Sequence, residues 1–186
     1  MNTPNKLTVA RVIITPLFML AFLSPLPHRF LIGAIIFSIA SITDALDGKL
    51  ARKNNQITTF GKFLDPVADK MLTTAALLAF IQEGLCSAWP VFIILTREFI
   101  VTSMRLISAA QNIVIPANIW GKIKTATQMA FIIIILLWGE LVELKGFLIK
   151  DFPTVTNVMI WITAVLAAIS GIVYLAQAKK TIDFSK

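Results

Sequence analysis

Four aspartates stand close together in the stretch "SITDALDGKLARKNNQITTFGKFLDPVADKM", residues 41–71. Asp44 and Asp47 are three residues apart, and Asp65 and Asp69 are four apart. On a helix, each spacing places both carboxylates on one face. Carboxylates gathered in this way repel one another, and one or two divalent cations remove the repulsion. Because all the donors are oxygens, we expect Mg²⁺ first and Mn²⁺ or Ca²⁺ after it.

Three plainer interpretations of the aspartates compete with a catalytic metal site. The carboxylates could form a solvated helix-end face that pairs with neighbouring lysines and arginines. They could line a cation or proton path, a usual role of carboxylates inside membranes. Against a path, Glu98 is the only other acid well inside a predicted span. They could also clamp a structural metal, which leaves the nearby glycines and Arg52 without a role.

The composition is that of a membrane protein rather than a soluble domain. The 186 residues are 57% hydrophobic and 15% charged, with a mean hydropathy of +0.81. The apolar residues form long runs, which favours bilayer spans. The lone Cys86 excludes an intrachain disulfide, and the lone His28 excludes a zinc site built on histidines. We expect a single transmembrane domain covering residues 1–186.

Six apolar segments of about 20 residues are long enough to cross a bilayer as helices. Turn-forming sequences separate them, such as "SPLPHR" after the first and "EGLCSAWP" after the third. The predicted fold class is therefore an all-α integral membrane protein, a bundle of six transmembrane helices. The predicted spans are residues 7–24, 30–47, 62–82, 89–110, 118–138 and 154–177.

Positive charge is concentrated on one side of these spans. The formal net charge is +7, and an even number of spans places both termini on the same side as the 48–61 and 111–117 connections, where most basic residues lie. By the positive-inside rule this side is cytoplasmic, so we expect the aspartates at the cytoplasmic boundary, where a blind pocket opening to the cytoplasm fits better than a channel. The basic residues also attract membrane lipid headgroups. These residues adjoin spans and form no separate module, which argues against nucleic-acid binding.

The aspartates belong to a longer pattern with fixed spacing. It reads Asp44-x-x-Asp47-Gly48-x-x-Ala51-Arg52, then eight residues, then Gly61-x-x-x-Asp65-x-x-x-Asp69. This pattern resembles the signature of the CDP-alcohol phosphatidyltransferase family, with every signature position present. The resemblance implies six transmembrane helices in the bacterial cytoplasmic membrane, a cytoplasm-facing polar cavity, a homodimer and a site for two metal ions, Mg²⁺ or Mn²⁺.

The resemblance also implies roles for the signature residues. All four aspartates would ligate the metals, and Asp69 would in addition take the proton from the acceptor alcohol. Gly48 and Gly61 would let the backbone approach the cytidine nucleotide closely. Ala51 would leave room for the nucleotide, and Arg52 would bind a phosphate oxygen.

The CDP-lipid site is expected to extend to the first predicted span. Asn5, Thr8 and Arg11 follow one another at three-residue steps, so they face one way on a helix. By resemblance, Asn5 and Thr8 would help to close the pocket. Capping of the first helix is the alternative role of Asn5.

Three further stretches bear on the acceptor alcohol. They are "NTPNKLTVARV", "TREFIVTSMRLISAA" and "GKIKTATQM". They resemble the branch of the family that transfers the phosphatidyl group from CDP-diacylglycerol to sn-glycerol 3-phosphate, giving phosphatidylglycerophosphate and CMP. No residue looks like a nucleophile activated by a neighbouring base, which favours direct displacement. Another acceptor, such as inositol phosphate, serine or phosphatidylglycerol, is the alternative within the family, and a small cation or proton transporter is the alternative outside it.

A phosphorylated acceptor needs a basic pocket, and the later spans offer one. Arg97 and Arg105 are eight residues apart, about 12 Å along a helix and little more than two turns, so they share a face. Lys122 and Lys124 enter from the next span, and Glu98 would neutralise a neighbouring cation. For Lys124, a lysine whose ammonium group reaches the interface to anchor the helix is the plainer interpretation.

Overall fold

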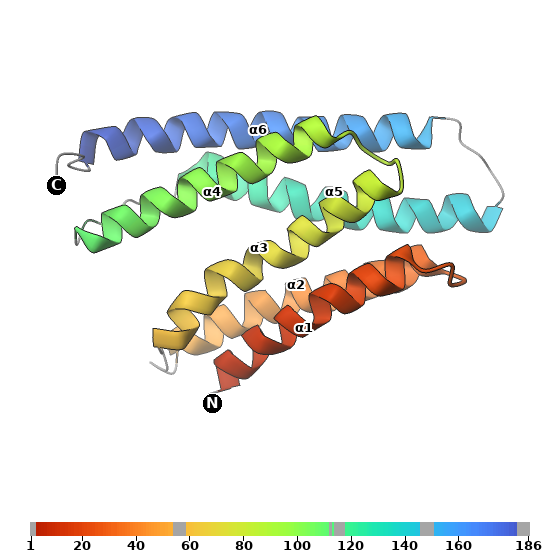
Figure 1. The fold of residues 1–186 in the computed structure, drawn as a ribbon, viewed down its shortest axis with the longest axis horizontal. Helices are drawn as coiled ribbons and strands as arrows, with labels where there is room; N and C mark the ends of the chain where they lie inside the picture. The colour runs from red at the N-terminus through yellow and green to blue at the C-terminus, as the bar shows by residue number, and fades with distance from the viewer. Residues whose placement is uncertain (1–2, 54–58, 112, 114–117, 146–150, 182–186) are drawn as a thin grey trace. The chain divides into compact units, whose positions relative to one another are not determined.

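The structure is a computed structural model (Figure 1) that describes residues 3–53, 59–111, 113, 118–145 and 151–181. Within the helices, the side chains of residues 3–7, 44–53, 59–66, 69, 145 and 180 lie outside the description. The described residues contain six helices and no strand, which confirms the predicted all-α class. The helices are α1 (Thr3–Leu23), α2 (Arg29–Lys53), α3 (Thr59–Gln82), α4 (Ala88–Ala110), α5 (Ile119–Lys145) and α6 (Phe152–Thr181).

The predicted spans fall on these helices, but several helices extend beyond the predicted ends. The predicted connection 48–61 is too long, because α2 continues to Lys53 and α3 begins at Thr59. Lysine, leucine, alanine and arginine, the residues after Gly48, are strong helix formers and carry the helix past its apolar part. Likewise α5 continues to Lys145 instead of ending near residue 138, because "ELVELK" contains no helix breaker.

The chain divides into two compact units. Unit 1 comprises Met1–Gly84 and Ile132–Phe152, and unit 2 comprises Leu85–Phe131 and Pro153–Lys186. The division falls within α5, which contributes its first part to unit 2 and its last part to unit 1. The single domain expected from the sequence stays a prediction.

Unit 1 is organised by α1, which packs against both α2 and α3 (Figure 1). Aromatic side chains fill the space between the three helices. The ring of Phe18 stacks on that of Phe22 with 5.9 Å between centroids, and also contacts Phe37 at 6.1 Å. Phe22 in turn meets Phe80 of α3 edge-on at 5.9 Å. All four rings are fully buried, so they form the apolar core that holds α1, α2 and α3 together.

Ion pairs close one end of unit 1. The guanidinium of Arg29, the first residue of α2, contacts Glu83 at 2.6 Å, directly after α3 ends, and Glu143 of α5 at 3.6 Å. The same guanidinium lies over the rings of Phe22 and Phe30, at 5.9 and 5.1 Å from their centroids. The beginning of α2 and the end of α3 therefore meet, and the two helices run antiparallel.

A third carboxylate, that of Glu140, caps the same end. Glu140 contacts Nδ1 of His28 at 2.5 Å and accepts a hydrogen bond from the backbone N–H of Leu31 at 3.1 Å. A carboxylate at the first turn of a helix satisfies a free N–H group and opposes the positive end of the helix dipole. His28 itself lies in the turn before α2 with φ +60°, which confirms that it is a turn residue.

Unit 2 consists of α4, the first part of α5, and α6. One end is joined by side-chain hydrogen bonds between the segment that precedes α4 and the beginning of α6. The backbone N–H of Ser87 donates to Oδ1 of Asn157 at 2.9 Å, and the hydroxyl of Thr156 donates to the carbonyl of Leu85 at 2.5 Å. These bonds satisfy polar groups at the two helix ends.

Among the residues that the structure describes, two helices are long and apolar enough to cross a membrane. They are Ile119–Leu144 of α5, with 26 residues and a mean hydropathy of 1.8, and Phe152–Lys179 of α6, with 28 residues and a mean hydropathy of 2.3. The described parts of α1, α2 and α3 hold shorter apolar stretches, Thr8–Leu23, Arg29–Thr43 and Lys70–Gln82.

We predict that Gly139→Ala lowers the stability of unit 1. A methyl group at Gly139 would lie 2.3 Å from the ring of Phe30, which is held by Phe22, Phe152 and Arg29 and has little room to move. Overpacking of this kind costs about 1–3 kcal/mol. The measurement is the thermal unfolding midpoint of the purified protein in detergent.

Gly33→Ala is the matched control. A methyl group there would meet its nearest atoms at 3.4 Å or more, an ordinary contact distance. We expect it to leave the midpoint unchanged or to raise it, since alanine favours helix over glycine by about 1 kcal/mol. Equal midpoints for the two variants would contradict the proposed packing of Phe30 against Gly139.

Candidate active site

The antiparallel register of α2 and α3 determines where the four aspartates stand on the backbone. Asp47 lies 18 residues after Arg29, and Asp65 lies 18 residues before Glu83. Each separation is about 27 Å along a helix. Asp44 and Asp69 lie 15 and 14 residues from the same ion pair, about 22 Å. The two aspartate pairs therefore stand at matching levels of the α2 and α3 backbones; that their carboxylates converge stays a prediction.

The donor set fits a divalent cation by its chemistry. It consists of carboxylates alone, which suit a hard ion such as Mg²⁺ or Mn²⁺. The side chains of Asp44, Asp47, Asp65 and Asp69 lie outside those that the structure describes. Among the side chains that it does describe, no three His, Cys, Asp or Glu residues form an alternative metal site.

The other signature residues are on the same two helices. Gly48, Ala51 and Arg52 follow Asp47 on the last turns of α2, and Gly61 lies on the first turn of α3. The sequence predicted a connection over residues 48–61, whereas the structure places these four residues on helices. Their backbone positions relative to the aspartates are therefore set by helix geometry. The side chains of Ala51 and Arg52 are also outside the described ones.

On α1, two polar side chains are buried in an otherwise apolar helix. Thr8 is 2% exposed and Arg11 is 3% exposed, and the carbonyl of Arg11 accepts a hydrogen bond from Thr15 at 2.9 Å. Arg11 lies 12 residues before Leu23, the last residue of α1, which is about 18 Å along the helix. Burying a charged side chain costs free energy, so Arg11 is a candidate for a functional role. The side chain of Asn5 is not among those described.

In unit 2, the structure brings Arg97 and Lys124 together around Glu98. Nη1 of Arg97 lies 3.5 Å from Oε1 of Glu98, and Nζ of Lys124 donates to the same oxygen. Nη2 of Arg97 donates to the hydroxyl of Ser170 on α6 at 2.6 Å. The exposed fractions of the Arg97, Glu98 and Lys124 side chains are 11%, 19% and 2%. This burial corrects the interpretation of Lys124 as a lysine that reaches the interface.

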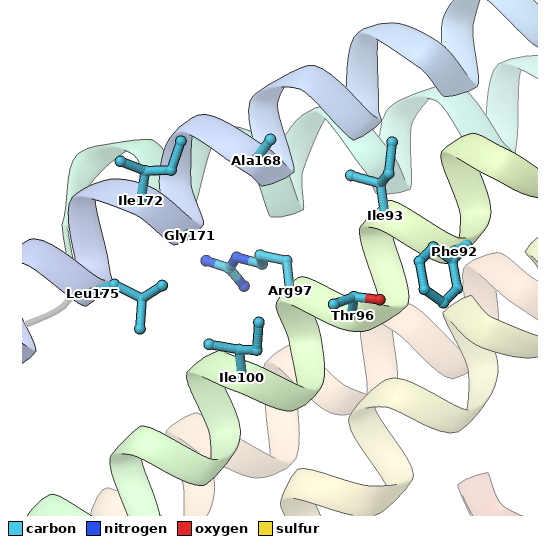
Figure 2. A pocket seen from close by; sticks show the side chains of 9 residues that line it. All are labelled: Phe92, Ile93, Thr96, Arg97, Ile100, Ala168, Gly171, Ile172 and Leu175. Carbon is cyan, nitrogen blue, oxygen red and sulfur yellow. The ribbon is translucent and has the colours of Figure 1, made fainter.

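Two glycines form the slot that holds the Arg97 side chain. A methyl group on Gly171 of α6 would lie 3.1 Å from Cγ of Arg97, and one on Gly121 of α5 would lie 3.4 Å from Nη2. Figure 2 shows Arg97 extending from α4 toward Gly171. A side chain at Gly171 would therefore crowd the arginine, whereas one at Gly121 would meet it at an ordinary contact distance.

The remaining two predicted basic residues are exposed. Arg105 lies on the same helix as Arg97, and its guanidinium is 5.7 Å from the ring centroid of Tyr174 on α6. Lys122 lies on the first turns of α5. The structure thus groups Arg97 with Lys124 through Glu98, and it holds Arg105 separately against Tyr174.

An apolar cavity of about 240 Å³ lies beside Arg97, between α4 and α6 (Figure 2). Its lining consists of apolar side chains and Gly171, apart from Thr96 and Arg97. Arg97 is the one charged residue among the described residues of this lining, and its guanidinium contacts Ser170 and Glu98.

Sequence reasoning missed three residues of unit 2. Asn118 caps α5, since its Oδ1 accepts the backbone N–H of Gly121 at 2.7 Å. Ser170 holds Arg97, and Tyr174 is fully buried beneath Arg105. The asparagine before a helix was a readable signal. Ser170 and Tyr174 lie on an apolar helix, and only tertiary contacts bring them to the arginines.

Comparisons with known proteins agree with the signature. The sequence model of the CDP-alcohol phosphatidyltransferase family matches residues 1–170. Similar proteins named CDP-diacylglycerol–glycerol-3-phosphate 3-phosphatidyltransferase occur in several bacteria. The one from Bacillus subtilis (strain 168) is 41% identical over 95% of this chain and 94% of its own. The one from Rickettsia bellii is 38% identical over 96% of each chain.

The fold is also known from a solved structure. The crystal structure of Mycobacterium tuberculosis phosphatidylinositol phosphate synthase in apo form matches with a TM-score of 0.61 at 20% identity, covering 94% of this chain and 90% of that one. At this identity the match shows the shared fold alone. The family model and the near full-length relatives carry the assignment, and the chain belongs to the CDP-alcohol phosphatidyltransferase family.

Proposed function

We propose that this chain is a phosphatidylglycerophosphate synthase, which transfers the phosphatidyl group of CDP-diacylglycerol to sn-glycerol 3-phosphate and releases CMP. The single observation that carries the proposal is the complete aspartate signature, whose two halves stand at matching levels of α2 and α3. The names of the relatives support the same donor and the same acceptor alcohol. The reaction is a step of phospholipid biosynthesis.

The donor half of the reaction is assigned to α2 and α3. Asp44, Asp47, Asp65 and Asp69 would hold two Mg²⁺ or Mn²⁺ ions, which when bound would neutralise the pyrophosphate and stabilise the departing CMP. Asp69 accepts the proton of the attacking hydroxyl. Gly48 and Gly61 admit the nucleotide close to the backbone, Arg52 binds a phosphate oxygen, and direct attack on phosphorus follows.

The acceptor half is assigned to the basic residues of unit 2. Glycerol 3-phosphate carries a phosphate of about two negative charges, which cations in an apolar protein bind strongly. Arg97, Arg105, Lys122 and Lys124 are the four candidates. Arg97 is the best placed of them to offer a fork of N–H donors, because Ser170 and Glu98 hold its guanidinium.

All six helices are proposed to span the membrane, with both termini and the aspartates on the cytoplasmic side. The support is the clear span character of α5 and α6 and the excess of basic residues on one side. CDP-diacylglycerol would keep its acyl chains in the bilayer while its headgroup enters the polar cavity. The homodimer implied by the family resemblance stays a prediction.

We expect purified protein to release CMP from CDP-diacylglycerol when glycerol 3-phosphate and Mg²⁺ are present, and chelation with EDTA to stop the release. The measurement is CMP formation with labelled acceptor, together with identification of the lipid product. Serine, inositol phosphate and phosphatidylglycerol are the comparison acceptors. A preference for one of these would overturn the acceptor assignment. Metal flux in liposomes without any CMP release would overturn the assignment of the protein as an enzyme.

Asp69→Asn is expected to reduce turnover to background while CDP-diacylglycerol still binds. The amide cannot take up the proton of the acceptor hydroxyl, whereas three carboxylates remain to hold the donor. The measurements are CMP release and equilibrium binding of the labelled donor. Asp151→Asn, at an exposed position before α6, is the control and should keep full activity. Activity above a tenth of wild type in Asp69→Asn would argue against its role as the base.

The proposed orientation of the chain in the membrane can be tested by labelling the two ends of α6. Thr181→Cys and Asp151→Cys place single exposed thiols at its two ends. A membrane-impermeant maleimide should label Thr181→Cys only in inside-out vesicles and Asp151→Cys only in right-side-out vesicles. The opposite pattern would reverse the topology.

The native cysteine supplies the background control. Burial raises the pKa of the Cys86 thiol to about 11, so that at pH 7 it is protonated and unreactive. The wild-type chain should therefore take up little label in either vesicle. After solubilisation in detergent, both engineered cysteines should react to the same extent.

A further inference from the structure

The buried charges of unit 2 centre on one oxygen atom. Oε1 of Glu98 contacts Arg97, its neighbour on α4, and Lys124 from α5. All three side chains are largely buried, and Lys124 almost completely. Two cations held this close repel each other in an apolar environment, and a carboxylate between them offsets the repulsion. Glu98 is therefore the group that allows the two cations to lie together.

Two donors beside this cluster have no hydrogen-bond partner. Nε of Arg97 and Nδ2 of Asn118 are buried and unpaired. The Asn118 side chain is close to the arginine, because a methyl group on Gly121 would lie 3.2 Å from Asn118 Oδ1 and 3.4 Å from Arg97 Nη2. Buried donors are rarely left unpaired in native proteins. An oxygen-rich anion would supply acceptors to both.

We propose that Glu98 is a positioning residue for the acceptor alcohol. Its carboxylate holds Arg97 and Lys124, from two different helices, at one point, so that both are in place for the phosphate of glycerol 3-phosphate. Glu98 acts through these cations and does not touch the substrate. Groups held in advance bind more tightly, since less ordering is left to the binding step. The inference rests on the proposed function, because it requires a phosphorylated acceptor.

The test is the steady-state kinetics of Glu98→Gln, which keeps the shape and a hydrogen-bond acceptor but removes the charge. We expect the KM for glycerol 3-phosphate to rise roughly 10-fold or more, as for other residues that orient a binding group. The kcat and the KM for CDP-diacylglycerol should change less than about twofold, because the lost interaction concerns binding of one substrate. Competitive inhibition by inorganic phosphate should weaken by the same factor as the KM rises.

Glu143→Gln is the matched control. Glu143 also pairs with an arginine, Arg29 at 3.6 Å, but in unit 1 and away from the proposed acceptor residues in the chain. Its loss should leave both KM values unchanged. An equal rise of both KM values in Glu98→Gln, or no rise at all, would overturn the inference.

Exchanging the charges of Glu98 and Lys124 distinguishes an effect on acceptor binding from an effect on folding. This variant also serves as the test if Glu98→Gln does not fold. The double variant Glu98→Lys, Lys124→Glu retains one carboxylate among two cations. We expect it to regain the thermal midpoint of wild type but to keep the raised KM for glycerol 3-phosphate. Recovery of the KM would show a merely structural ion pair and overturn the inference. Wild-type protein that releases no CMP with glycerol 3-phosphate would instead overturn the proposed function, and the inference with it.

Discussion

The ion pair between Arg29 and Glu83 is the interaction on which the aspartate site depends. It joins the first residue of α2 to the end of α3 at 2.6 Å, and so fixes both the direction and the register of the two helices. Arg29 also lies over two phenylalanine rings, which removes the pair from open solvent and makes it stronger than a surface pair. A slip of one turn would move the aspartate levels apart by about 5 Å.

The apolar core of unit 1 supports the same register. Phe18 and Phe22 on α1 contact rings on α2 and α3, so α1 works as the spacer between the helices that carry the signature. If the four carboxylates converge as proposed, they repel one another, and the rings packed between the helices oppose the separation that this repulsion favours. The proposed chemistry at one end of unit 1 would thus be supported by apolar packing in the middle and by ion pairs at the other end.

Unit 2 differs from unit 1 in that it holds buried cations. Arg97 is tolerated because Gly171 leaves room for its side chain and because Ser170 and Glu98 receive its N–H groups. Lys124 is tolerated because it reaches the same carboxylate. In an apolar protein each buried charge needs such partners, and their arrangement leaves N–H donors of Arg97 and Asn118 for a further acceptor.

The sequence by itself determined the helical class, the approximate position of every helix and the signature residues. Apolar runs and turn residues depend on local physics, and fixed spacing within one helix already places two carboxylates on a face. It did not reveal that the signature continues along helices through Gly48 and Gly61, since the apolar pattern ends before the helix does.

Only the tertiary structure decided which distant residues meet. The partnership of Arg97 with Ser170 joins residues 73 positions apart, and that of Arg29 with Glu83 joins two helix ends. Neither follows from local periodicity, because burial and pairing depend on how helices face one another. Lys124 illustrates the difference most plainly: its sequence position near a span end favoured an interfacial lysine, and the fold buries it against Glu98 because a carboxylate there offsets the unfavourable burial of its charge.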